Sequence, residues 1–229
     1  MPRALAPAHG RGSQRRGSIE ALPRPIQEEL RRSAPAGKAR DAMSRLARAI
    51  ELLDRDDPKA AAAEAEKAKS LAPRSSAVRE VLGLAYYGLE RWQDALTELK
   101  AYKRFSGRTD QNHLIADSLR GLGRPQEAVA LAEEALRGKG VPNEAKAEAV
   151  IVAASALADQ ERFAEALAFL GRARTREDVA EPYTLRLWYV RGDILAKAGR
   201  REEASMEFRK IVRHDAGAFD AAERLAELS

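Results

Sequence analysis

The chain has 229 residues, with 40 Lys or Arg against 35 Asp or Glu, and a formal net charge of +5. Aromatic residues make up only 5% of it, and a composition led by Ala, Leu, Arg, Lys and Glu favours helices over strands. Cysteine is absent, which excludes disulfides, thiolate metal sites and cysteine nucleophiles. No apolar segment approaches the roughly 18 residues that a membrane span needs, so we expect a cytoplasmic protein without membrane contact.

The positive charge is concentrated at the N-terminus. Residues 1–40 contain nine cations and three anions, a net charge of +6, so the remainder carries −1. Residues 1–36 are therefore expected to form a basic, flexible and largely disordered tail. The first 18 residues have no apolar core of a secretory signal, and the Ala- and Arg-rich composition of the whole chain is typical of high-GC bacterial coding.

One stretch of this tail has a helical pattern. In residues 25–32, Pro25 suits a helix start, and Ile26 and Leu30 fall on one face. We expect a short helix near 25–32 that docks on or beside the first helical hairpin.

From about residue 40 to residue 229 the chain repeats itself. Five alanines recur at intervals of 34, 33, 38 and 38 residues, each has another small residue twelve positions before it, and turn signals such as Gly123-Arg124-Pro125 lie between the two. The alanines are Ala61, Ala95, Ala128, Ala166 and Ala204, and the earlier small residues are Ala49, Gly83, Ala116, Ala154 and Gly192. Small residues at both positions allow two helix axes to approach to about 8 Å, so the pattern predicts a row of helical hairpins.

The clearest repeat is LGLAYYGLERWQDALTELKAY, residues 82–102, which resembles the tetratricopeptide repeat at Leu82, Gly83, Tyr86 and Ala95. Arg48 and Arg191 stand where that family prefers leucine. The resemblance covers about residues 40–229 and implies an all-α fold, a right-handed superhelix of about five hairpins with a concave groove. A capping helix at about 218–228 would close the last hairpin.

The aromatic residues of the same stretch could mark a ligand pocket or could be packing. Tyr86 lies three residues after Gly83, on the same helix face, and Trp92 opens the second helix of its hairpin. Apolar residues at helical spacing are usually core, so we interpret both side chains as packing.

The resemblance also implies which residues face the groove, namely outward positions on the first helix of each hairpin. These positions are Met43, Leu46, Ile50, Glu80, Leu84, Tyr87, Asp110, His113, Asp117, Arg120, Ile151, Ser155, Arg186, Tyr189 and Asp193. Some family members hold a peptide carboxylate with Lys and Asn at such sites, and that clamp is missing here. The first two hairpins instead offer an apolar floor that suits an amphipathic helix or an extended apolar peptide, unless the N-terminal segment covers it.

The sequence contains few of the residues and motifs that catalysis requires. It contains no phosphate-binding glycine loop, no nucleophile elbow and no metalloprotease motif, and its three histidines are scattered. Asp110, His113 and Asp117 share one helix face and could hold a divalent metal, although a polar patch or a helix start is the simpler interpretation. We expect no enzyme and no catalytic, cofactor or metal site.

Two functions remain open. The first is a non-enzymatic adaptor or scaffold that binds a protein or peptide in its groove. The second is an RNA- or ribosome-associated factor whose tail contacts phosphates through Arg3, Arg11, Arg15 and Arg16, without aromatic residues among them to stack on bases. The sequence does not identify the partner, the process or the oligomeric state.

Overall fold

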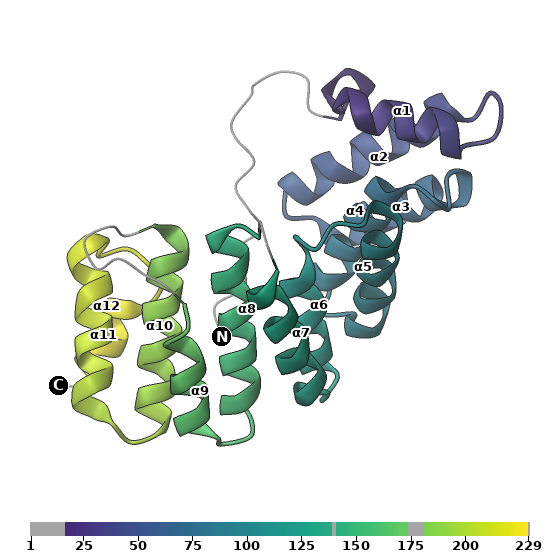
Figure 1. Cartoon of the computed structure of the whole chain (residues 1–229). Coiled ribbons are helices and arrows are strands. Elements are labelled where there is room, and N and C mark those ends of the chain that lie inside the picture. The colour runs from purple at the N-terminus through teal and green to yellow at the C-terminus, as the bar shows by residue number, and fades with distance from the viewer. Residues whose placement is uncertain (1–16, 139–140, 174–180, 229) are drawn as a thin grey trace. The chain divides into compact units, whose positions relative to one another are not determined.

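The computed structural model describes residues 17–138, 141–173 and 181–228, and all regular structure within these ranges is helical (Figure 1). The four tail arginines named above lie outside the described residues. Contacts divide the chain into two compact units, one ending at Leu122 and the other beginning at Gly123, and each is described by itself. No helix in the described ranges is long and apolar enough to cross a membrane.

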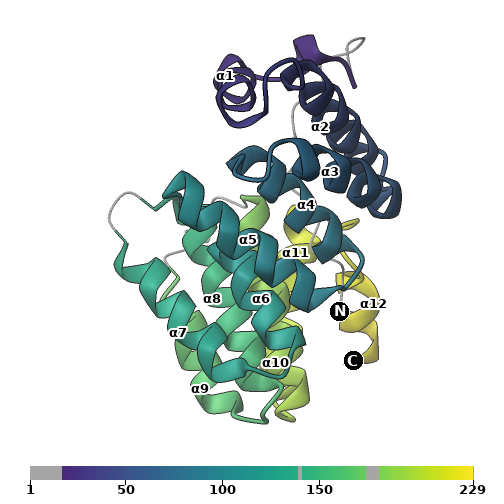
Figure 2. The same ribbon diagram turned by 90° about the vertical axis from the view of Figure 1, so that its right-hand side faces the viewer.

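From residue 17 onward, where its description begins, the first unit contains a short 3-10 helix followed by six α-helices (Figures 1 and 2). Helices α2 and α3 form one hairpin, α4 and α5 form the next, and α6 packs on α5. Their bounds are η1 Ile19–Ala21, α1 Arg24–Ser33, α2 Ala39–Asp54, α3 Pro58–Leu71, α4 Ser76–Gly88, α5 Trp92–Ser106 and α6 Asn112–Gly121. The short helix expected near residues 25–32 therefore corresponds to α1, which packs against α2.

The second unit continues the pattern of consecutive helix pairs. Each helix packs on the next, and α10 also contacts α8. The bounds are α7 Pro125–Arg137, α8 Asn143–Ala158, α9 Phe163–Leu170, α10 Pro182–Lys197, α11 Arg201–His214 and α12 Ala221–Glu227. The prediction of an all-α fold built from helical hairpins is confirmed, and α12 lies where a capping helix was expected.

The ten registered small residues all lie within helices. All ten are buried, and the eight alanines among them have no exposed surface. A Cβ atom at Gly83 would lie 2.7 Å from the Leu99 side chain, and one at Gly192 would lie 3.0 Å from the Phe208 ring. Because real Cβ contacts are longer, neither position has room for a side chain unless its neighbour moves. At these two crossings the prediction that a small residue permits close helix contact is confirmed, with Leu99 and Phe208 opposite the glycines.

The turns inside the hairpins share one backbone conformation. Five residues before each registered alanine lies a residue with positive φ. These are Asp56, Glu90, Gly123, Glu161 and Gly199. At Glu90 the backbone N–H donates to the Tyr87 carbonyl at 3.0 Å, and the Arg91 N–H donates to the Tyr86 carbonyl at 2.9 Å. This pair of bonds is the Schellman motif, which ends a helix through a left-handed residue.

Candidate functional site

Polar side chains link α4 to α6 in the first unit. The Gln111 amide donates to Glu80 Oε1 at 2.7 Å, just before α6 begins. Two helical turns further along α4, the Tyr87 hydroxyl donates to Asp117 Oδ2 at 2.5 Å, and Arg120 Nε donates to Asp117 Oδ1 at 2.8 Å. All five side chains are partly exposed. The first helices of two successive hairpins thus present hydrogen-bonded side chains on one surface.

An apolar side chain lies between these two links. Leu84 follows Glu80 by four residues and precedes Tyr87 by three, so the three share one face of α4. Leu84 is half-buried. We call the surface formed by Glu80, Leu84, Tyr87, Gln111, His113, Asp117 and Arg120 the α4–α6 face.

The start of α6 is organised around Asp110. The Tyr102 hydroxyl donates to Asp110 Oδ1 at 2.8 Å, the Arg108 guanidinium pairs with Oδ2, and His113 Nδ1 lies 3.0 Å from the Asp110 carbonyl oxygen. Burial and the hydrogen bond to Asp110 raise the pKa of Tyr102 above its ordinary value. Asp110 therefore acts as an acid at a helix start, one of the two interpretations of the Asp110–His113–Asp117 pattern.

The metal interpretation of that pattern finds no support in the geometry. Asp110 is bonded to Tyr102 and Arg108, while Asp117 is bonded to Tyr87 and Arg120. In the part of the chain that the structure describes, no three His, Cys, Asp or Glu side chains come together in a way that could hold a metal ion.

The apolar floor expected at the first hairpin is already filled. Met43 and Leu46 of α2 are 3% and 0% exposed, and they share one apolar cluster with Leu22 and Leu30 of the N-terminal segment. Ile50 is half-buried at the edge of the same cluster. The expectation that Met43 and Leu46 line an open groove is corrected, because the N-terminal segment adds apolar surface that the repeat pattern does not include.

Two more of the expected groove residues are buried in the second unit. Ile151 is 6% exposed, and Ser155, four residues further along α8, is 5% exposed. Helix α8 is buried along nearly its whole length because it packs on α7, α9 and α10. These two positions are also corrected from groove to core.

The last hairpin is covered as well. The Tyr189 ring lies 5.0 Å from the Phe219 ring and 5.7 Å from the Phe208 ring, and Tyr189 is 6% exposed. Burial and a hydrogen bond to Asp220 raise the pKa of Tyr189 to about 12. Tyr189 thus packs beneath the segment that leads into α12, and it too is corrected from groove to core.

The two charged groove positions of the second unit are partly exposed and ion-paired. Arg186 Nη1 lies 2.8 Å from Glu148 Oε1. Arg224 of α12 donates to Asp193 Oδ1 at 3.1 Å, and Lys197 Nζ lies 2.9 Å from Asp193 Oδ2. These pairs tie α10 to α8 and to α12, so their arrangement is explained by packing between neighbouring helices.

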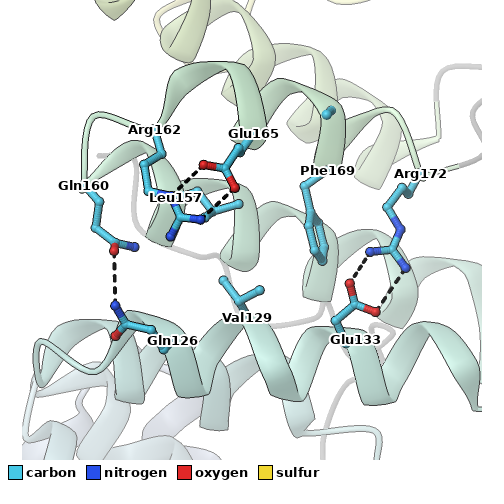
Figure 3. Close-up of a pocket in the computed structure, with 10 residues that line it drawn as sticks. Gln126, Val129, Glu133, Leu157, Gln160, Arg162, Glu165, Phe169 and Arg172 are labelled. Atoms are coloured by element: carbon cyan, nitrogen blue, oxygen red, sulfur yellow. Dashed lines mark hydrogen bonds and ion pairs between the residues drawn. The ribbon is translucent and has the colours of Figure 1, made fainter.

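The structure also shows a trough between α7 and α9 that the sequence did not indicate (Figure 3). Its volume is about 520 Å³, and its apolar lining includes Val129 of α7, Leu157 of α8 and Phe169 of α9. The sequence signal for it is weak, because apolar residues at helical spacing predict core positions whether or not the neighbouring helix fills the space beside them.

Side chains close the trough at both ends. At one end Gln126 Nε2 donates to Gln160 Oε1 at 3.3 Å, and at the other Arg172 pairs with Glu133 and lies 4.7 Å from the Phe169 ring (Figure 3). The guanidinium holds the pKa of the Glu133 carboxyl below its ordinary value. A ligand in this trough would meet mainly apolar carbon, because these polar groups are bonded to one another.

The α4–α6 face is the better candidate site. It combines an apolar side chain with hydrogen-bonding groups, and most of its residues were expected at the groove from the sequence. The structure brings six of those residues together at partial exposure. They are Glu80, Leu84, Tyr87, His113, Asp117 and Arg120.

Comparisons with known proteins agree with this architecture. Sequence profiles described as tetratricopeptide repeat match residues 46–109, 113–182 and 185–216. No curated protein matches the chain.

Several solved structures have a similar fold. YrrB, described as a TPR protein with an unusual peptide-binding site, has a TM-score of 0.55 at 18% identity, over 90% of this chain and 98% of that one. TTC0263, a thermophilic TPR protein of Thermus thermophilus, has a TM-score of 0.63 at 18% identity, over 82% and 98%. NprR, solved with its cognate peptide NprX, has a TM-score of 0.56 at 15% identity, over 93% and 66%. At these identities the likeness shows the fold.

Proposed function

The chain belongs to the tetratricopeptide repeat family, and we propose that it is a non-enzymatic adaptor that binds a peptide or protein segment on the α4–α6 face. The observation that carries this proposal is the link between Tyr87, Asp117 and Arg120 beside the partly exposed Leu84. These hydrogen bonds hold polar side chains in fixed positions on the surface. Packing of the helices into a core does not by itself require polar groups there.

The chemistry of the face favours an extended segment. Leu84 offers an apolar contact for one side chain of the partner. The carboxylates of Glu80 and Asp117 are hydrogen-bond acceptors, and each carboxylate oxygen can accept more than one hydrogen bond. Backbone N–H groups, or a basic side chain, would therefore match the polar part of the face.

Preorganisation supports this use of the face. Tyr87 contacts Trp92 edge-on, with the ring centroids 5.4 Å apart, and the Trp92 ring lies so close to Gly121 that a Cβ atom there would be 2.8 Å from it. The Tyr87 side chain is thus held by packing on one side and by Asp117 on the other. Rigid side chains lose less conformational entropy on binding, which favours affinity.

The known structures provide a second line of support. YrrB is described by its peptide-binding site, and NprR was solved with a bound peptide. Both share the helical repeat architecture, in which first helices of successive hairpins line an extended surface.

The test uses a displayed library of random peptides selected on the full-length chain. Peptides that bind are then measured against Leu84→Glu, which places a charge in the apolar centre of the face, and against Thr97→Glu, a matched control at an exposed position on α5. We expect Leu84→Glu to reduce affinity at least about tenfold, since burying an unpaired charge is costly, and Thr97→Glu to leave it unchanged. Equal binding by both variants would refute the assignment of this face.

A further inference from the structure

Helix α1 packs on a defined surface of the first repeats, which we call its seat. The seat consists of the apolar cluster around Met43 and Leu46 of α2 and the start of α4 at Ser76 and Ala77. Leu30 has no exposed surface, and Ile26, four residues before it on the same face, packs against the same apolar cluster as Met43 and Leu46 of α2. The opposite side of α1 is exposed and carries Arg31 among other charged residues. The contact is thus made by one apolar face of an amphipathic helix.

The seat also has a polar component at the start of α4. The Ser76 hydroxyl donates to Glu29 Oε2 at 3.0 Å, and the Ala77 backbone N–H donates to Glu29 Oε1 at 3.4 Å. The first N–H groups of a helix lack partners within it and carry partial positive charge, so they favour an anion. Ser75 already caps this end by accepting from the Val78 N–H, which means that Glu29 adds a contact where a cap is present.

The segment containing α1 holds itself together and is joined to the repeats by a short link. The Gln27 amide donates to the carbonyl oxygens of Ile19 and Leu22, at 3.3 and 2.8 Å, which ties η1 to α1. Residues 34–38 connect α1 to α2, and Gly37 in this link has a φ of 76°. A Cβ atom at Gly37 would meet nothing within 4 Å, so the link has space around it.

We propose that the seat of α1 is a binding site for an amphipathic helix of a partner protein, and that α1 is its internal ligand. The partner helix would carry the pattern of residues 26–30: an apolar residue, then, three and four positions later, an acid and a second apolar residue. The acid would bind the start of α4, and the apolar pair would replace Ile26 and Leu30 against α2. This inference does not rest on the α4–α6 face, since it concerns a different surface and a different class of ligand.

The balance of energies makes exchange feasible. A helix of ten residues is marginal in water by itself, so α1 gains most of its stability from the seat. The short link raises the effective concentration of α1 at the seat to the order of millimolar, which a partner helix must overcome. A longer partner helix, already stable before binding, would not have to spend binding energy on its own folding.

The experiment measures binding of a labelled synthetic peptide of residues 17–34 to the full-length chain by fluorescence anisotropy. The peptide can bind only when α1 leaves the seat. In a Leu30→Ala chain, where α1 is held more weakly, we expect the peptide to bind at least about tenfold more tightly than it binds the wild type, because a larger fraction of seats is vacant. A peptide carrying Leu30→Asp should not bind, and one carrying Glu29→Gln should bind about two- to fivefold more weakly.

A covalent lock provides the decisive control. The chain has no cysteine, so Glu29→Cys with Ser76→Cys can be joined selectively by a short bismaleimide across a pair of side chains that already touch. We expect peptide binding by the double variant to disappear after cross-linking, with the helical content unchanged by circular dichroism.

Three outcomes would overturn the proposal. The first is peptide binding that survives cross-linking, and the second is no peptide binding to the Leu30→Ala chain while that chain remains folded. The third is a concentration-dependent dimer of the wild type that Leu30→Asp abolishes, because the exchanged helix would then come from a second copy of this chain and not from another protein.

Discussion

The left-handed residues in the hairpin turns give a direct test of how backbone conformation limits stability. Glu90 has a φ of 57°, a conformation that glycine adopts freely and that costs other residues about 1–2 kcal/mol. In two of the other hairpin turns the same position is occupied by a glycine, Gly123 or Gly199. Replacing Glu90 by glycine removes this strain, while the greater freedom of glycine in the unfolded chain costs about 0.4–1 kcal/mol. We therefore expect Glu90→Gly to stabilise the first unit by about 0.5–1 kcal/mol.

The two tryptophans of the chain permit a local measurement. Trp92 lies in the first unit and Trp188 in the second, so a Trp188→Phe background leaves one reporter next to the altered turn. Urea unfolding followed by Trp92 fluorescence would give the free energy of unfolding, and far-ultraviolet circular dichroism would show whether the whole chain unfolds with it. A local probe is needed because repeat arrays do not always unfold as one unit.

The matched control places glycine in a helix of the same unit. Lys100 is exposed within α5, and Lys100→Gly should destabilise by about 1 kcal/mol because glycine lowers helix propensity. The two substitutions therefore have opposite predicted signs. If Glu90→Gly lowered the free energy of unfolding as Lys100→Gly does, positive φ would not be the controlling feature of this turn.

Three further predictions concern packing, the candidate site and pH. Gly83→Ala should destabilise the first unit by about 1–3 kcal/mol, since the new methyl group would meet Leu99; urea unfolding measures the loss, and a second substitution, Leu99→Ala, should make the methyl group harmless. Tyr87→Phe keeps the ring but removes the donor to Asp117, and it should weaken peptide binding at the α4–α6 face more than it lowers the unfolding midpoint. The pKa of Tyr189 is raised to about 12 in the folded protein. The stability that the protonated Tyr189 side chain contributes is therefore complete below the ordinary tyrosine pKa near 10 and is lost as the pH rises to about 12. An ultraviolet phenolate titration in which all tyrosines of the folded protein ionise together near pH 10 would contradict this prediction.

The hairpins were predictable from the sequence because their determinants are local and periodic. A small residue at a crossing point, such as Gly83 opposite Leu99, is required by the distance between two helices that are adjacent in the chain. The same requirement recurs at every hairpin, so the signal accumulates over the five repeats. The helix bounds followed from proline and turn residues, as at Pro58 and Pro125, which begin α3 and α7.

The left-handed conformation at Glu90, Asp56 and Glu161 was not predictable in the same way. Two of the five turns use glycine at this position, but the other three use residues that rarely adopt positive φ. The hydrogen bonds of the Schellman motif at the ends of these first helices require this conformation whichever residue occupies the position. Three of the five turns therefore lack the glycine that would have indicated it in the sequence.

The candidate site was only partly predictable, because exposure depends on segments outside the repeat. The register placed Leu46 of α2 and Glu80 of α4 at equivalent outward positions of successive first helices. Leu46 is nevertheless fully buried, while Glu80 remains partly exposed. The difference arises from α1, whose Leu30 belongs to the same cluster as Leu46. Likewise, no spacing rule indicated that Tyr87 would bond to Asp117, since the two residues are thirty positions apart.

Both ends of the repeat region need a segment that covers their apolar side chains, and a different segment does so at each end. A terminal hairpin has no neighbour on one side, so its apolar positions would be exposed without a covering element. In the first unit α1 covers Met43 and Leu46 and binds the start of α4 through Glu29. In the second unit the segment leading into α12 covers Tyr189, and Arg224 bonds to Asp193.

The two covering elements differ in how they are attached, and this difference favours α1 as the exchangeable one. Helix α12 follows the last hairpin directly in the chain and packs on α11, as the first helix of a further repeat would. Helix α1 lies outside the repeat register and reaches its seat through the link at Gly37. Its removal would expose apolar surface but would break no contact between hairpins. Substituting Leu30 by alanine should therefore lower the protection of α1 amides from hydrogen exchange while leaving that of α4 and α5 nearly unchanged, and an equal loss of protection in all three helices would show that α1 is an integral part of the first unit.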